Sequence, residues 1–302
     1  MRKFLLYGFM LSVLCLLQSA CRKTLHENVH ENLVVPVDHG TLPTSISTVD
    51  LEAYINKLYV DLLGREPLAA ELSAAVSDFR SASTTVLAKE NLVNQLMLSH
   101  TFFEQLFIKT SNNVLNGTSK LEITQQGAQF QSLYQSSLAN NDQVGANYML
   151  SEYNRVADLY YCDSLYRIGN LSINQFYARF LNNYFYDQIN MGSENFVKAC
   201  FENLFHRAAT ANELAAGKTM VDGFNAATLF GQSGTGKGDF IQIVVYSNDF
   251  YEGMIRGAYL NFLLREPSDT EIHTLQDQLA AHNHDYLFLL KTILASKNYA
   301  GF

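Results

Sequence analysis

The chain has 302 residues, of which 48% are hydrophobic and 17% are charged, and its formal net charge is −8. A chain of this size can bury one large core or two smaller ones. The excess of acidic residues argues against binding to nucleic acid and against an electrostatic attachment to anionic lipids.

Residues 1–20 have the features of a bacterial lipoprotein signal peptide. Two basic residues precede the apolar run from Phe4 to Leu17, and small residues stand just before Cys21. This run is too short and too close to the N-terminus for a permanent membrane span. We therefore expect cleavage before Cys21 and a lipid on this cysteine, which anchors the protein to a membrane. Gln18 departs from the usual pattern, and plain secretion with cleavage near Ala20 is the alternative.

Residues 21–48 are predicted to be a flexible tether. They show no sustained hydrophobic period, and they contain two prolines and one glycine. His26 and His30 are spaced to share a helical face as metal ligands. Because they belong to a duplicated His-Glu-Asn in a polar segment, a solvated tail is the simpler interpretation, and no metal site is predicted.

Three copies of one motif organise the rest of the chain. In each copy an arginine stands six residues before a glutamate, and an aliphatic residue follows the glutamate. The pairs are Arg65 and Glu71, Arg207 and Glu213, and Arg265 and Glu271. Apolar residues occur two, three, six, seven, ten and eleven positions before each arginine. This spacing is typical of one wide apolar stripe on an α-helix, so each copy is predicted to begin with a core-facing helix.

The residues around each arginine predict a tight corner and a second helix. Gly64 is a suitable left-handed stop for the first helix. Thr210 with Glu213, and Ser268 with Glu271, have the spacing of a capping box, whereas Leu68 replaces the hydroxyl in the first copy. Because the Arg/Glu pairs recur at equivalent corners, we interpret them as caps or local ion pairs and not as catalytic pairs.

A second landmark closes each copy. A serine preceded by two apolar pairs is followed, three residues later, by an aromatic residue. The three serines are Ser99, Ser247 and Ser296. The predicted organisation is a first repeat over residues 49–107, an insert over 108–193, and a second and third repeat over 194–302.

The apolar helix ending in LLGREP, the Glu-Leu that follows and the closing S-x-x-F together resemble a known family. It comprises small helical bacterial domains of unknown function that are related to phycobilisome linker polypeptides. The resemblance covers about residues 52–107 and 196–302. It implies a helical fold and a place in secreted proteins, surface-layer proteins or assembly linkers, without known catalytic residues. The second copy departs most, since it has His206 in place of the glycine and no proline, so its corner is expected to differ.

The insert is rich in Asn, Gln and Tyr, and its apolar spacing predicts three or more helices. Turns are expected near Asn116, Asn140 and Gly169. A surface cluster of its tyrosines would suit a glycan or a protein partner, because tyrosine combines a large contact area with a polar tip. The candidate binding residues are Tyr153, Tyr160 and Tyr161. The alternative is that these aromatic residues fill a core.

Several weaker patterns suggest chemistry but favour structure. Residues 231–237 match G-x-x-x-x-G-K, yet Gly238 replaces the hydroxyl residue and no parallel strand is predicted before the loop, so we expect a flexible glycine loop. His282, His284 and Asp285 suit a polar turn better than a metal site. Pairing of Cys162 with Cys200 in an oxidising compartment is one alternative, but Cys200 falls on a core position, so buried and unpaired thiols are the favoured expectation. No catalytic residue, metal or cofactor is predicted, because no nucleophile with its base and no carboxylate cluster can be assembled.

The sequence therefore predicts an all-α helical bundle built from three helix-corner-helix repeats plus a helical insert. The expected function is that of a non-enzymatic interaction or assembly module, lipid-anchored at the outer membrane or cell surface of a Gram-negative bacterium. An envelope protein or a glycan is the expected partner, besides the membrane itself. The alternative is an accessory protein that binds a surface polysaccharide through the tyrosine-rich insert.

Replacement of the predicted lipidation site provides a direct test of the anchor. Cys21→Ser is expected to release the protein from the membrane fraction, because the acyl chains supply the attachment and an acidic chain gains none from anionic lipids. Fractionation followed by a high-salt wash measures this. A variant that still sediments with the membranes would show that something other than lipid holds it.

Overall fold

The computed structural model describes residues 46–302, and this part of the chain is all-α with one small two-stranded sheet. The predicted signal peptide, Cys21, the two histidines of the tether and most of the tether lie outside the described residues. None of the described helices is long and apolar enough to cross a membrane.

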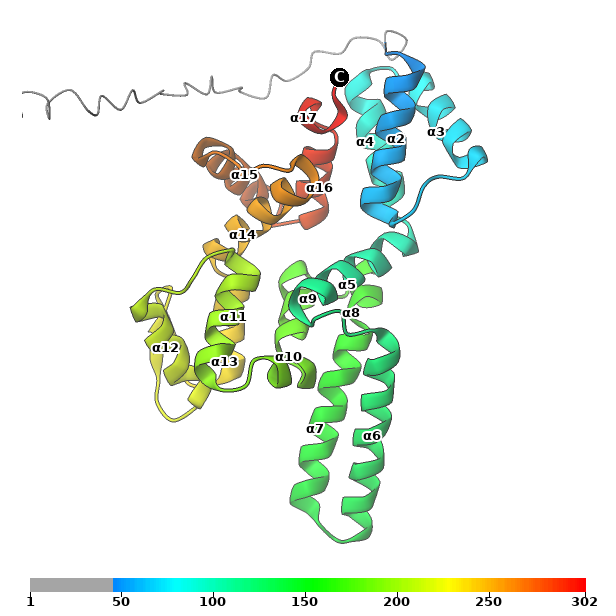
Figure 1. The fold of residues 1–302 in the computed structure, drawn as a ribbon. Coiled ribbons are helices and arrows are strands. Elements are labelled where there is room, and N and C mark those ends of the chain that lie inside the picture. Colours follow the sequence, from blue (N-terminus) through cyan, green and yellow to red (C-terminus); the bar gives the residue numbers. More distant parts are fainter. Residues whose placement is uncertain (1–45) are drawn as a thin grey trace, which may run out of the picture. The chain divides into compact units, whose positions relative to one another are not determined.

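The helices and strands follow one another along the chain as shown in Figure 1. The elements are α2 (Thr48–Leu63), α3 (Ala69–Ser81), α4 (Thr85–Met97), α5 (His100–Val114), α6 (Lys120–Ala139), α7 (Gln143–Tyr160), α8 (Cys162–Arg167), α9 (Ile173–Leu181), α10 (Tyr184–Ile189), α11 (Ser193–Phe205), α12 (Ala211–Asp222), β1 (Ala227–Leu229), β2 (Gln232–Gly234), α13 (Lys237–Val245), α14 (Asn248–Ala258), the π-helical turn η2 (Tyr259–Leu263), α15 (Asp269–Ala281), α16 (Tyr286–Leu294) and α17 (Lys297–Ala300).

The apolar stripes predicted from the spacing form the core. All six stripe positions are buried in α2 and in α11, and five of six are buried in α14 and η2, where Leu263 is half-buried. Burying one such side chain contributes about 1.5–3 kcal/mol. The stripes therefore fix which face each of these helices turns inward.

All three corners begin with a left-handed residue directly before the arginine. Gly64 has φ of 69°, His206 has φ of 53° and Leu264 has φ of 55°. In this backbone conformation the second corner does not differ as expected, because a histidine adopts the conformation that glycine adopts in the first. Left-handed geometry costs a residue with a side chain roughly 1–2 kcal/mol. Because the His206 and Leu264 side chains are exposed, the helices and the Arg/Glu bonds on either side of each corner must offset this cost.

The second helix of each copy starts as the capping pattern predicts. Thr210 and Ser268 each form a complete capping box with the glutamate three residues on. At Leu68 only half of the box exists: the Leu68 N–H donates to Glu71 Oε2 at 2.8 Å, and the leucine has no oxygen with which to return the bond.

The three closing serines are helix N-caps. Each hydroxyl accepts from the N–H of the aromatic residue three positions on and donates to the carbonyl three positions back. The aromatic partners are Phe102, Phe250 and Tyr299, and the carbonyl partners are Leu96, Val244 and Ile293. The helix after Ser99 runs to Val114, so the predicted boundary at residue 107 falls inside α5. That prediction missed the boundary because polar Thr110 and Ser111 occupy buried positions.

Helix α14 serves two copies, since it follows the closing Ser247 and carries the apolar stripe of the third corner. It also packs tightly on the end of α11. A Cβ at Gly253 would lie 1.9 Å from the Leu204 carbonyl oxygen, so only glycine permits this approach. The close crossing brings α14 beside the second corner.

A fourth corner with related features lies at Asn116–Glu122, where the sequence predicted only a turn. Its backbone differs in one respect, because Gly117, with φ of 82°, is left-handed as well. Asn116 is left-handed with φ of 52°, and Ser119 forms a capping box with Glu122. Gly117 takes the place of the arginine, and the corner is one residue shorter. The six positions equivalent to the stripe are again buried: Leu106, Phe107, Thr110, Ser111, Val114 and Leu115.

The segment after this fourth corner also ends like the other copies. Asn183 takes the place of the closing serine: its Oδ1 accepts from the Tyr186 N–H at 3.0 Å, and its Nδ2 donates to the Phe180 carbonyl at 2.8 Å. Phe176, Phe180 and Leu181 before it are fully buried. We call these shared features the frame: a buried apolar stripe, a left-handed corner, a second helix that begins at the corner, and a closing helix capped by Ser or Asn. The structure has this frame at four places, with the insert built into one of them.

The helices that precede the closing residues pack on one another in pairs, α4 with α16 and α9 with α13. The first and last copies are also joined by hydrogen bonds. The Tyr54 hydroxyl donates to the Leu294 carbonyl at 3.1 Å, and the Tyr299 hydroxyl donates to Asp61 at 2.7 Å. Segments some 240 residues apart along the sequence therefore share one core.

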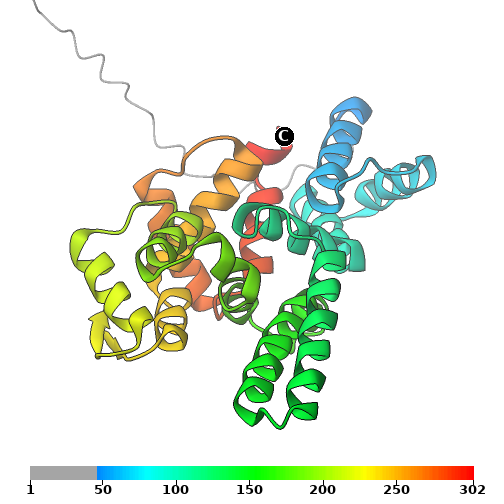
Figure 2. The same cartoon turned by 60° about the horizontal axis from the view of Figure 1, so that its bottom comes forward.

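Helices α6 and α7 form a long antiparallel hairpin. They pack chiefly on each other, and they extend beyond the other helices in Figures 1 and 2. At about 1.5 Å per residue, the 20 residues of α6 span about 30 Å. Turns at Asn141 and Gly169, both with positive φ, agree with the predicted breaks in the insert.

Candidate functional site

Each of the three predicted arginines forms the same contacts at its corner. Both terminal nitrogens donate to the glutamate six residues on, and one of them also donates to the carbonyl of the next residue. The arginine-to-carboxylate distances are 2.7 and 2.7 Å for Arg65 to Glu71, 2.9 and 2.7 Å for Arg207 to Glu213, and 2.9 and 2.5 Å for Arg265 to Glu271. Because the same glutamate accepts from the N-cap N–H, it links the corner to the start of the second helix.

These contacts keep the corner glutamates ionised. Hydrogen bonds from the arginines lower the pKa of Glu71, Glu213 and Glu271 from 4.5 to about 2. A carboxylate held this far below neutral pH makes a poor general acid or base. The Arg/Glu pairs therefore suit a structural role, in which they fix the backbone conformation of the corner.

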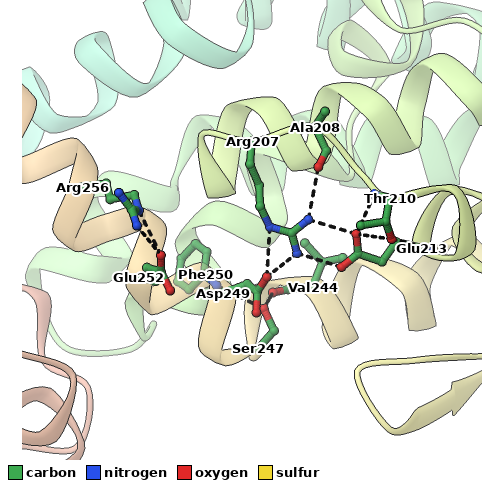
Figure 3. A network of polar contacts seen from close by, with 10 residues as sticks. All are labelled: Arg207, Ala208, Thr210, Glu213, Val244, Ser247, Asp249, Phe250, Glu252 and Arg256. Carbon is green, nitrogen blue, oxygen red and sulfur yellow. Dashed lines mark hydrogen bonds and ion pairs between the residues drawn. The ribbon is translucent and has the colours of Figure 1, made fainter. Parts of the chain in front are cut away.

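The second corner is the most elaborate, and Figure 3 shows its network. Arg207 also bonds Asp249 on α14, with 3.2 Å from Nε to Oδ2 and a second contact from Nη2. Its guanidinium lies over the rings of Phe201 and Phe205, at 5.1 and 5.5 Å from their centroids, within the range of a cation–π contact. This arginine therefore joins the end of α11, the start of α12 and the start of α14.

A pocket of about 170 Å³ opens beside this network. It is lined by Phe205, His206, Arg207, Asp249, Glu252, Arg256 and Glu266. All five N–H groups of Arg207 are used within the protein, and Arg256 is bonded to Glu252 at 2.7 and 2.9 Å. A charged ligand would have to displace these internal partners, so the pocket offers a stabilising network and no ready binding site. Within residues 46–302 no group of three or more His, Cys, Asp or Glu is placed to hold a metal ion.

The tyrosines of the insert do not form one surface cluster. Tyr186 is fully buried, and Tyr153, Tyr160, Tyr166, Tyr177 and Tyr184 pack against the core. Of the seven tyrosines from Tyr153 to Tyr186, Tyr161 is the exposed one, at 56%, and its ring meets Tyr160 edge-on at 4.9 Å. The alternative interpretation, in which these aromatic residues fill a core, therefore holds for most of them.

The G-x-x-x-x-G-K stretch is not a phosphate loop. Strand β2 lies within it and pairs antiparallel with β1, directly before it, as a tight hairpin, so the expectation of a plain glycine loop is wrong as well. The Lys237 ammonium bonds Asp187 and lies 4.7 Å from the Phe196 ring centroid. Asp187 also accepts from Arg155 at 2.6 Å, and Arg155 in turn bonds buried Glu152 at 2.6 Å. This shielded charge network ties α7, α10 and α13 together, and no local pattern in the sequence predicted it.

The remaining candidates have structural roles. Cys162 and Cys200 are free and buried, as predicted, and burial raises the pKa of both thiols, that of Cys200 to about 12. They are protonated at neutral pH and therefore poor nucleophiles. His282 stacks on Phe288 and His284 stacks on Tyr251, while Asp285 caps α16.

Comparison of the chain with protein-family models, with curated proteins and with solved structures found no match. The resemblance to the relatives of phycobilisome linkers therefore stays a prediction.

Loss of the arginine should weaken the second corner more than the third. We expect Arg207→Ala to lower the free energy of unfolding by about 1–2 kcal/mol and Arg265→Ala by about 0.5–1 kcal/mol, because Arg207 also bonds Asp249. Denaturant titration measures both values, with Arg167→Ala, at an exposed position of α8, as the matched control. Equal losses at the two corners would mean that the bond to Asp249 adds nothing.

The depressed pKa of Glu213 predicts a pH dependence. A carboxylate whose pKa is lower in the folded than in the unfolded chain stabilises the fold above the unfolded value, here 4.5. This contribution is lost as the pH falls from 4.5 toward 2. Glu213→Gln should therefore flatten the decline in unfolding free energy over that interval. An unchanged decline in the variant would contradict the assignment.

Proposed function

We propose that the protein is a non-enzymatic interaction or assembly module of the cell envelope, anchored through a lipid on Cys21. The outer membrane or cell surface of a Gram-negative bacterium is the proposed location. The signal-like N-terminus supports the anchor, and the distribution of contacts in the described residues supports the interaction role.

The observation that carries this proposal is the contrast between the corners and the α6–α7 hairpin. The arginines and glutamates of the corners are paired with each other, so they have little capacity left to bind a substrate. The hairpin instead exposes large apolar side chains, with Val144 at 83% and Tyr148 at 60% exposure. Apolar side chains exposed on an element that packs chiefly on itself favour contact with another macromolecule.

Polysaccharide binding through the insert has weaker support. Of the three tyrosines suggested for that role, Tyr153 and Tyr160 pack against the core and Tyr161 is exposed. A single exposed ring gives a sugar chain a small stacking platform.

Capture from detergent-solubilised envelopes tests the proposal. The tagged full chain should retain a protein in stoichiometric amount. Leu133 lies on α6 and is 41% exposed, so Leu133→Glu should reduce this retention by placing a charge on the hairpin surface. Phe224→Glu, at an exposed position between α12 and β1, is the matched control. Retention of an envelope polysaccharide in place of a protein, abolished by the double change Tyr160→Ala and Tyr161→Ala, would overturn the proposal.

A further inference from the structure

The insert departs from the frame at one definite point. The second helices of the other copies, α3, α12 and α15, have 13, 12 and 13 residues, whereas α6 has 20 and is followed by the return helix α7. Three copies complete the frame without this extension. The extra length of α6 and α7 is therefore not needed to close a copy of the frame.

The outer part of the hairpin has almost no core of its own. Residues 131–151 include one buried residue, Ala146, and no residue of α6 beyond Phe130 is buried. Helices in proteins gain most of their stability from packing an apolar face against a neighbour. Contact with a partner would therefore bury surface of the outer hairpin that the rest of the chain leaves exposed.

The two most exposed apolar residues of α7 lie on one side of the helix. Val144 and Tyr148 are four residues apart and share a helix face. Each is two residues from Ala146, which corresponds to about 200° around the helix. Since Ala146 is fully buried, Val144 and Tyr148 lie on the outward side.

The charge of this surface favours a second copy of the same chain. Between Ile123 and Ser151 the sole charged side chain is Asp142, which caps α7 through the Gly145 N–H at 2.9 Å. The chain as a whole carries −8. Two identical acidic chains repel each other over most of their surfaces, and this repulsion is smallest where charge is absent.

The polar residues here are also self-complementary. The same stretch contains nine Gln and Asn residues. An amide side chain both donates and accepts hydrogen bonds, so two copies of one amide-rich surface can satisfy each other across a two-fold axis. A surface of like charges could not do so.

We infer that two copies of this chain associate through their α6–α7 hairpins, with Val144 and Tyr148 in the contact. The four helices bury each other's outward faces, and the amide side chains pair between the copies. This inference rests on the proposed interaction role and names the partner at the same surface.

Sedimentation equilibrium of the full chain carrying Cys21→Ser tests the inference without interference from a lipid. The measured mass should be twice the 34.0 kDa of one chain. The double change Val144→Glu and Tyr148→Glu should weaken dimerisation about 100-fold or more, because each copy then brings two unpaired charges into the contact. Phe224→Glu should leave the dimer intact, and circular dichroism should show unchanged helix content in every variant.

Two results would overturn the inference: a chain that stays monomeric at all concentrations, or a dimer that the double change does not weaken. Failure of this inference and failure of the proposed function are distinguishable. A monomeric chain that still retains a different envelope protein through the hairpin would refute self-association while leaving the interaction role standing.

Discussion

The glutamate at the third position of each second helix is the contact on which the frame depends. Glu71, Glu122, Glu213 and Glu271 each accept from the N–H of the residue that caps their helix. A chain that reverses direction between two helices leaves backbone groups unpaired at both ends. One carboxylate satisfies the start of the second helix, and a left-handed residue ends the first. In three of the four corners the arginine then links the end of the first helix to the start of the second.

The corner arginine supplements this frame and does not create it. At Asn116–Glu122 the corner forms with Gly117 in its place, since the left-handed turn, the capping box and the buried face of α5 are all present. The arginine matters most where it reaches a third element, as Arg207 does through Asp249. The close crossing at Gly253 provides that opportunity by bringing α14 to the end of α11.

Features with local causes were predictable from the sequence, and features with distant causes were not. Stripes, capping boxes and closing serines follow from helical spacing and short hydrogen bonds, so their residues were identified correctly. The fourth copy was missed because Thr110 and Ser111 hide its stripe and Asn183 replaces its serine. The left-handed conformations of His206 and Leu264 have no side-chain signature. The pair of Lys237 and Asp187 spans 50 residues, and only the fold brings the two together.

The differences among the four copies separate the residues that stabilise the fold from those proposed to contact a partner. In three copies the polar groups of the corner are paired internally and the second helix ends after 12 or 13 residues. In the remaining copy the arginine is absent, and the second helix continues into a hairpin whose outer part, between Ile123 and Ser151, has Asp142 as its sole charged side chain. The frame buries the base of this hairpin at Ile123 and Phe130, so its position is fixed while its outer surface contributes little to the core. A change in the outer hairpin should therefore cost the fold little, which is the arrangement that the proposed interaction role requires.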